Sequence, residues 1–312
     1  MMISRILSIA IAIVLLTIPA SAQQALDDGD IHIWPVHGNV YLLVGAGSNI
    51  TLSVGNDGVL MVDAGAAQMT GRVLDAIQKF TRQRDPYGPS LPIRYLINTA
   101  VDADHTGGNS NIAGSSIFKP LDGGEMIIAH DNVLTRMAEA PEKAQPTHTY
   151  QTDQYKLNRF FNGEGVQVIH MPAAHTDGDS IVWFRFSDVI STGDLFTDSY
   201  PVIDIQQGGS VQGLLSALNQ IIDLVFPEFR VQGGTMLIPG HGRVSDLTDI
   251  AYYRDMVTIV RDRVQDMINR GMTLEQVKAG KATLDFDPIY NRRPGASEKF
   301  VEAVYRSLTT KK

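Results

Sequence analysis

A short segment in the first third of the chain is dense in groups that can bind a metal ion. Asp102, Asp104 and His105 fall within four positions of NTAVDADHTGGN, residues 98–109. Carboxylate and imidazole groups are the donors that zinc and similar divalent cations take when no thiolate is present, and the chain has no cysteine. Alternate-residue spacing puts Ala100 where a further ligand is expected. The segment therefore predicts a metal site that lacks one ligand.

Three later segments supply further donors, and each follows a short apolar run typical of a strand. They are AHTDGDS with His175, TGD with Asp194 and PGHG with His241. Loops at the ends of rigid strands commonly present functional groups, and glycines allow the backbone to approach a centre closely. These residues, together with Asp104 and His105, form the predicted metal-binding set.

Short β-branched runs separated by turn signals predict the strands that position these segments. The sequence GNDG at residues 55–58 predicts a hairpin turn, and Thr273 with Gln276 predicts a capping box that opens a helix. The predicted strands are 40–44, 50–54, 59–62, 93–97, 126–129, 166–169, 181–186, 189–191 and 235–239. The other predicted helices are 70–83, one that begins near 132, 214–225, 252–270 and 297–308.

Two β-rich halves that each carry helices predict an α+β layered sandwich with its helices outside. The residues after His241 change in character and read as amphipathic helices. We therefore expect one domain over residues 23–245 and a helical extension over 246–312 that packs on the same domain.

The N-terminus, MMISRILSIAIAIVLLTIPASAQQ, is typical of a secretory signal peptide. Arg5 precedes an apolar run over residues 6–18, and a small-x-small pattern ends at Ala22, after which we expect cleavage. An uncleaved anchor is the alternative, but the run is short for a span of ~20 residues. The prediction is a periplasmic or secreted protein without a stable membrane span after cleavage.

The charge distribution limits the classes of partner. The formal net charge is −8, and Lys and Arg form no run. This argues against nucleic acid or an anionic membrane as a partner, because both attract basic surfaces. A small-molecule substrate is the expected partner, and the sequence does not identify any protein partner.

The order and spelling of these segments resemble the metallo-β-lactamase superfamily over about residues 31–244. The usual first motif of that family is Asn-Thr-His-x-His-x-Asp-His-x-Gly-Gly-Asn, and NTAVDADHTGGN is similar to it. AHTDGDS, STGDLF and IPGHG resemble the segments of the third histidine, the bridging aspartate and the last histidine. Asp63 in LMVDAG matches the family's early aspartate, which supports the metal loop without ligating. The resemblance implies a four-layer αβ/βα sandwich with a metal site at one edge and the helical extension outside the shared core.

The resemblance implies one altered metal position and one intact one. In two-metal members the first ion takes three histidines, and here Ala100 and Asp102 replace two of them while His175 matches the third. The ligands of the second ion are all present, namely Asp104, His105 and His241, and Asp194 matches the bridging carboxylate.

Three interpretations follow. In the first, one divalent ion, zinc or another metal, occupies the intact position, and Asp102 or His175 positions and deprotonates the attacking water. In the second, two ions bind and Asp102 serves as a ligand. In the third, the protein is a non-catalytic ligand-binding or accessory protein. Asp102 also resembles the choice of the diiron branch, so a mononuclear iron oxidoreductase is a further alternative.

We expect an exported metal-dependent hydrolase that acts on an amide, lactone or other ester bond, with β-lactams among the candidates. His130 either caps a helix or lies at the rim of the site, and His148 either enters the site or lies in a solvated loop. Asp179 is expected to hold its loop by hydrogen bonds. Tyr200 either lines a substrate groove or belongs to a structural loop.

Overall fold

The structure, a computed structural model, describes residues 29–84, 88–121, 127–157, 160–225 and 234–310. The predicted signal peptide, residues 1–22, lies outside these ranges. Among the described helices, none has both the length and the apolar character that a membrane crossing requires.

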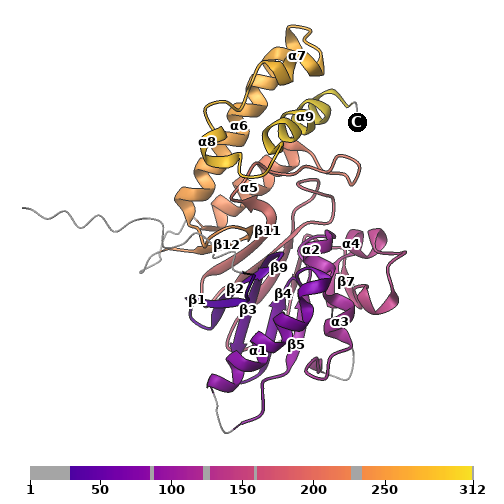
Figure 1. The fold of residues 1–312 in the computed structure, drawn as a ribbon, viewed down its shortest axis with the longest axis vertical. Helices are drawn as coiled ribbons and strands as arrows, with labels where there is room; N and C mark the ends of the chain where they lie inside the picture. Colours follow the sequence, from indigo (N-terminus) through magenta and orange to yellow (C-terminus); the bar gives the residue numbers. More distant parts are fainter. Residues whose placement is uncertain (1–28, 85–87, 122–126, 158–159, 226–233, 311–312) are drawn as a thin grey trace, which may run out of the picture.

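The first half of the chain forms a seven-stranded sheet in the order β1-β2-β3-β4-β5-β6-β7 (Figure 1). The pairs from β1 to β4 are antiparallel, and those from β4 to β7 are parallel. Because the carboxyl ends of parallel strands share one edge, the loops after β4, β5 and β6 begin side by side. The strands are β1 (His32–His37), β2 (Val40–Ala46), β3 (Ser48–Gly55), β4 (Gly58–Val62), β5 (Ile93–Ile97), β6 (Ile127–His130) and β7 (His148–Tyr150).

The second half forms a five-stranded sheet in the order β12-β11-β10-β9-β8. β11 and β12 are parallel, and the other pairs are antiparallel. The strands are β8 (Gln154–Lys156), β9 (Val166–His170), β10 (Ser180–Phe184), β11 (Val189–Thr197) and β12 (Met236–His241).

The two sheets pack face to face over an apolar core. Leu60 and Ile97 of the first sheet belong to the same buried cluster as Val168 and Val182 of the second. β4 is buried at all of its positions, as expected for a central strand covered on both faces.

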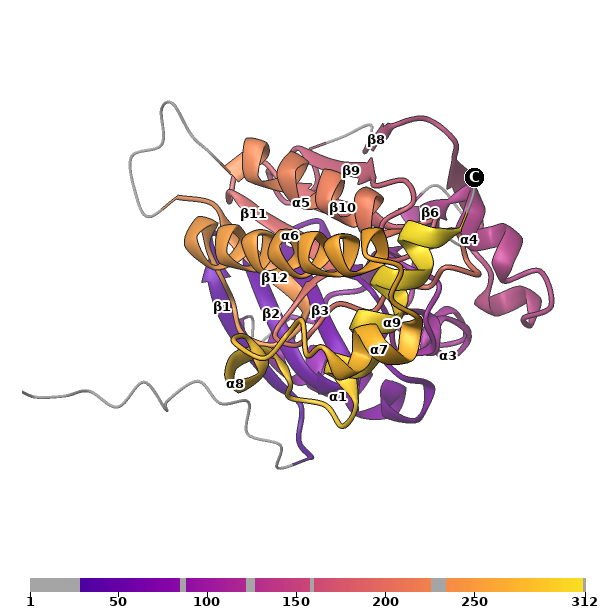
Figure 2. The ribbon, with the colours of Figure 1, turned by 90° about the horizontal axis from the view of Figure 1, so that it is seen from above.

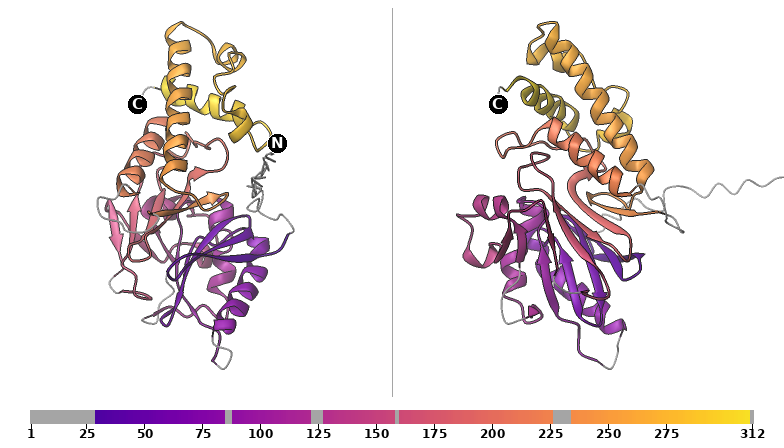
Figure 3. Two further views of the ribbon diagram at one scale, coloured as in Figure 1. Left: turned by 90° about the vertical axis from the view of Figure 1, so that its left-hand side faces the viewer. Right: turned by 180° about the vertical axis from the view of Figure 1, so that it is seen from behind.

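Helices cover the outer face of each sheet and complete four layers (Figures 1 and 3). On the first sheet, Val73 and Ile77 of α1 (Thr70–Arg84) pack in one cluster with Ile50 and Leu52 of β3. On the second sheet, α5 (Val211–Val225) lies against the strands, and α6 (Leu247–Asn269) runs beside α5 (Figure 2). The remaining helices are α2 (Ala103–Thr106), α3 (Asn109–Ala113), α4 (Asp131–Arg136), α7 (Leu274–Ala279), α8 (Asp287–Tyr290) and α9 (Ala296–Thr309).

The predicted α+β sandwich with a C-terminal helical region is confirmed. The capping box of Thr273 and Gln276 opens α7 as predicted. One strand differs in a way that matters for the site: β11 continues to Thr197, beyond the predicted end at residue 191, and so includes Asp194. The predicted strands and helices also omit β1 and six-residue or shorter elements such as α2, α3, β7, β8 and α8, most of which are too short to show a period.

Candidate metal centre

Both sheets contribute candidate ligands at one edge of the sandwich. From the first sheet, the loop after β5 and the short helix α2 carry Asp102, Asp104 and His105. From the second sheet, His175 lies in the loop between β9 and β10, Asp194 lies in β11, and His241 is the last residue of β12. The structure therefore brings all six predicted residues to the same edge, in two groups.

The first group consists of Asp104, His105, His241 and Asp194, and the first three each offer one ligand atom within 4.8 Å of the others. His241 Nε2 lies 3.2 Å from Asp104 Oδ2 and 3.6 Å from Asp194 Oδ1. His105 Nε2 lies 3.3 Å from the same Asp194 oxygen. Two imidazoles and two carboxylates thus converge, which is a donor set suited to zinc.

Two buried atoms of this cluster lack a hydrogen-bond partner among the described residues. They are His105 Nε2 and Asp194 Oδ1, whose mutual contact lacks hydrogen-bond geometry. Buried polar atoms are nearly always satisfied, and an unsatisfied pair costs free energy. A cation between them would satisfy both, so the residues present fit a bound divalent metal.

Asp63 orients His105 from behind. Its Oδ2 accepts a hydrogen bond from His105 Nδ1 at 2.8 Å, and its two oxygens also accept from the backbone N–H and the hydroxyl of Thr99. With Nδ1 held as the donor, Nε2 faces the cluster, as in carboxylate–histidine–metal arrangements. The early aspartate thus lies where the family resemblance implies, outside the candidate ligand group.

The electrostatics of this cluster favour a positive charge. Burial opposes protonation of His105, but Asp63 and Asp194 outweigh it and hold the pKa of His105 well above its usual value. Burial likewise opposes ionisation of Asp194, yet His105 and His241 lower the pKa of that carboxyl. The hydrogen bond from His241 lowers the pKa of Asp104. A metal ion can supply the positive charge that these carboxylates attract.

A glycine keeps the backbone close to this cluster. A Cβ atom at Gly240 would lie 2.1 Å from Asp194 Oδ1, which is closer than non-bonded atoms approach. Only glycine therefore allows β12 to approach β11 at this point, next to His241.

The second group is an ion pair between His175 and Asp102. His175 Nε2 lies 2.9 Å from Asp102 Oδ2, and His175 Nδ1 lies 2.8 Å from the carbonyl oxygen of Val202. Both ring nitrogens thus face oxygen acceptors, an arrangement that only the protonated imidazolium satisfies fully. Burial opposes this charge, but the hydrogen bond that His175 donates to Asp102 and the neighbouring carboxylates raise the pKa of His175 to about 10.

Asp102 is free to make this contact because it does not cap its own helix. It is the N-cap residue of α2, yet its side chain makes no capping hydrogen bond. Ala100, where the sequence analysis expects a further ligand, is buried and 1% exposed. The contacts with Asp102 and with the Val202 carbonyl thus engage both ring nitrogens of His175.

The supporting loop residues behave largely as predicted. Asp179 accepts hydrogen bonds from the backbone N–H and the hydroxyl of Thr176, and so holds the loop that carries His175. His130 caps α4, because its Nδ1 accepts from the Asn132 N–H at 3.3 Å, and its ring stacks on His170 at 3.6 Å. His148 differs from the prediction of a loop residue: it begins β7, where pairing with β6 holds it in the sheet, and its ring packs beside Tyr155.

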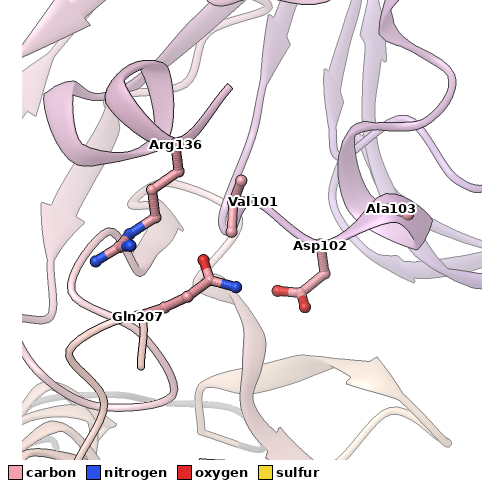
Figure 4. A pocket seen from close by; sticks show the side chains of 5 residues that line it. All are labelled: Val101, Asp102, Ala103, Arg136 and Gln207. Carbon is pink, nitrogen blue, oxygen red and sulfur yellow. The ribbon is translucent and has the colours of Figure 1, made fainter. Parts of the chain in front are cut away.

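A polar cavity of about 460 Å³ opens beside Asp102 (Figure 4). Val101, Ala103, Arg136 and Gln207 form the rest of its lining. Asp177 holds the guanidinium of Arg136 by two hydrogen bonds, at 2.9 and 2.6 Å. The sequence analysis did not identify Arg136 or Gln207, because neither belongs to a motif and only the fold places them next to Asp102.

Comparison with known proteins agrees with this geometry. The family model of the metallo-beta-lactamase superfamily matches residues 35–241. Solved structures with the same fold include the metallo-beta-lactamase from Pontibacter korlensis, at 14% identity and a TM-score of 0.57, over 73% of this chain and 99% of that one. DIM-1 metallo-beta-lactamase matches at 15% identity and a TM-score of 0.56, over 73% of this chain and 97% of the other.

A third solved structure extends further along the chain. A double mutant of the sec-alkyl sulfatase PisA1 matches at 16% identity and a TM-score of 0.66, over 89% of this chain and 50% of its own. Residues 1–245 make up only about four fifths of the chain, so this match must include part of the C-terminal helical region. A search of curated proteins gave no match.

Proposed function

Because the chain belongs to the metallo-β-lactamase superfamily, we propose that it is a metal-dependent hydrolase with one functional metal position. The observation that carries this proposal is the unsatisfied pair of His105 Nε2 and Asp194 Oδ1, which lies within a cluster of four donors. Asp104, His105 and His241 would hold the ion, and Asp194 would complete its protein ligands.

Zinc is the metal that this donor set suits best, although another divalent ion can take the same ligands. A divalent cation held there would supply Lewis-acid polarisation of a scissile carbonyl and would make bound water more acidic. The substrate class that we propose is an amide, a lactone or another ester, including β-lactams.

The ion pair of Asp102 and His175 supports one ion rather than two. A second ion would need a lone pair on His175 Nε2, so its binding would have to break the 2.9 Å contact of that atom with Asp102. In the proposed reaction Asp102 accepts the proton of the attacking water, and His175 holds the carboxylate in place. Asp102 is suited to this role because it is part-exposed and borders the cavity.

The cavity suggests a small polar substrate. Arg136 and Gln207 offer hydrogen-bonding groups opposite Asp102, and only Val101 and Ala103 add apolar surface (Figure 4).

We also propose that residues 1–22 direct export and that the mature protein acts in the periplasm or outside the cell. Sequencing the N-terminus of the mature protein would test cleavage after Ala22.

The metal content per chain tests the proposed function. Protein purified without added metal, and again after zinc addition, is expected to hold one ion by elemental analysis. His241→Ala should lose the ion, whereas the control His148→Ala, outside the cluster, should keep it. A panel of esters, lactones and amides should then show hydrolysis that a chelator abolishes and zinc restores.

Each other result has a defined meaning. Two ions per chain would favour the two-metal interpretation, in which Asp102 serves as a ligand. No ion after zinc addition would remove the hydrolase proposal and leave a ligand-binding protein. Redox turnover with iron instead of hydrolysis with zinc would favour the oxidoreductase alternative.

A further inference from the structure

A short segment after β11 lies between the two groups of candidate site residues. Residues 197–202, here called the bridging loop, begin at Thr197, which pairs with His241 across β11 and β12. The Asp198 N–H donates to the His241 carbonyl at 3.2 Å. At the other end of the loop, the Val202 carbonyl accepts the hydrogen bond from His175 Nδ1 at 2.8 Å. The position of this loop therefore affects a residue of each group.

The C-terminal helical region holds the middle of the bridging loop. The carbonyl of Tyr290, the last residue of α8, accepts hydrogen bonds from the Tyr200 N–H and the Ser199 hydroxyl, both at 3.0 Å. Arg292 lies 3.6 Å from Asp198. Every one of these contacts comes from residues beyond 241, where the match to the family model ends.

Tyr200 is the centre of this contact. Its side chain is buried, and its ring stacks on Phe300 of α9 at 5.4 Å. Its hydroxyl lies 2.8 Å from Asp287 Oδ1 and 3.1 Å from the Thr283 carbonyl, and it shares its proton between these acceptors. Tyr200 therefore belongs to a structural loop and does not line a substrate groove, because its hydroxyl points into the C-terminal helical region.

We infer that the C-terminal helical region is a working part of the site, and that Tyr200 is the positioning residue through which it fixes the bridging loop. This inference rests on the proposed function. The physical reason is that the loop leaves the end of β11 and has no strand pairing of its own beyond Thr197, so its geometry depends on partners outside the sheet. Loss of the Tyr200 hydroxyl should free the loop and loosen both His241 and His175.

The test compares Tyr200→Phe with a matched control, Tyr41→Phe. Tyr41 is also a buried tyrosine whose hydroxyl is hydrogen-bonded, but its partner is Arg84, and both lie away from the bridging loop. Hydrogen exchange of peptides covering residues 197–203 is measured on the metal-free protein. Zn²⁺ affinity is measured by competition with a chromogenic chelator.

We expect Tyr200→Phe to speed exchange in the bridging loop and to weaken Zn²⁺ binding about tenfold, the low end for partners that orient metal ligands. Ser199→Ala, which removes one hydrogen bond without changing the ring packing, should shift both measurements in the same direction by a smaller factor. Asp287→Asn keeps an acceptor oxygen and should behave as the wild type. Tyr41→Phe should change neither measurement.

The outcomes separate this inference from the proposed function. This inference alone would be overturned if the wild type binds Zn²⁺ and both Tyr200→Phe and Ser199→Ala keep the wild-type Zn²⁺ affinity and the wild-type exchange rate in the bridging loop. No Zn²⁺ binding by the wild type would overturn the proposed function and this inference together. If Tyr200→Phe does not fold, Ser199→Ala is compared with Asp287→Asn. Faster exchange and weaker Zn²⁺ binding in Ser199→Ala alone would support the inference, and equal results in the two variants would overturn it.

Discussion

His175 and Asp102 form a buried-to-exposed ion pair, with Nε2 and Oδ2 2.9 Å apart and side chains 2% and 33% exposed. The two residues are far apart in the sequence and come from opposite sheets. Their contact fixes a proton donor beside a carboxylate at the edge of the sandwich where the candidate donors gather.

The first prediction concerns the proposed base. Asp102→Asn should lower kcat about 100-fold or more, because the amide cannot accept the proton of water. The zinc content should stay at one ion per chain, since Asp102 is outside the proposed ligand group. Steady-state kinetics on the substrate found by the panel and elemental analysis check this together. Loss of the ion would instead identify Asp102 as a ligand.

A second prediction concerns Ala100 and Asp102, which stand where the family resemblance implies histidines. The double variant Ala100→His with Asp102→His removes the ion pair and supplies the two missing imidazoles. We expect the zinc content to rise from one to two ions per chain. The single variant Asp102→His is the control, since it lacks the donor at position 100. An unchanged stoichiometry in the double variant would show that the buried site of Ala100 cannot accommodate an imidazole ligand.

A third prediction concerns Asp63. Asp63→Asn should weaken Zn²⁺ binding about 10- to 100-fold, because the amide is a poor partner for the Nδ1–H of His105. Chelator competition measures the effect. Asp57→Asn is the matched control, since Asp57 is exposed and accepts a hydrogen bond from Asn162. Equal affinities in the two variants would show that Asp63 does not orient the ligand.

A fourth prediction concerns pH and the stacked pair of His130 and His170. Burial, with a smaller contribution from His170, lowers the pKa of His130 to about 4 from a usual 6.5. Between these values the unfolded chain binds more protons than the folded one, so the free energy of unfolding falls as the pH drops from 6.5 to 4. The loss from this group is on the order of 3 kcal/mol once the pH is below both values.

Urea unfolding at pH 7 and pH 4.5 tests this dependence. His130→Asn keeps a residue that favours helix N-caps but does not titrate, so its stability should fall less than that of the wild type over this interval. Parallel pH dependences in the two proteins would assign the acid sensitivity to other groups.

Most of the fold follows from local patterns, because its longer strands and helices have clear periods. The run 93–97 is β5 itself, and the amphipathic pattern after residue 252 falls within α6. Short polar strands such as β8 depend on their neighbours and leave no such pattern. The length of β11 was underestimated because Gly193 and Asp194 disfavour strands, whereas pairing of Gly193 and Thr197 with β12 continues the strand past them.

The motifs predicted which residues gather at the edge, but not how they pair. The family resemblance implied that Asp102 and His175 face the same position, but it did not predict their ion pair, and nothing in the sequence links Tyr200 to Asp287 or Tyr290. Such contacts join segments far apart in the chain, and they become visible only when the sheets and the C-terminal helices are placed. Assignment of the ligand roles remains a prediction for the metal analyses above.

The candidate donors are divided between the two sheets, and this division has a consequence for stability. Asp104 and His105 come from the first sheet, whereas Asp194 and His241 come from the second. The chain has no cysteine, so no disulfide ties the halves together. An ion held by all four would act as a cross-link between them. By linkage, saturation at 1,000 times the dissociation constant would add about 4 kcal/mol to the free energy of unfolding. Metal supply would then set how long the folded protein survives as well as how fast it reacts.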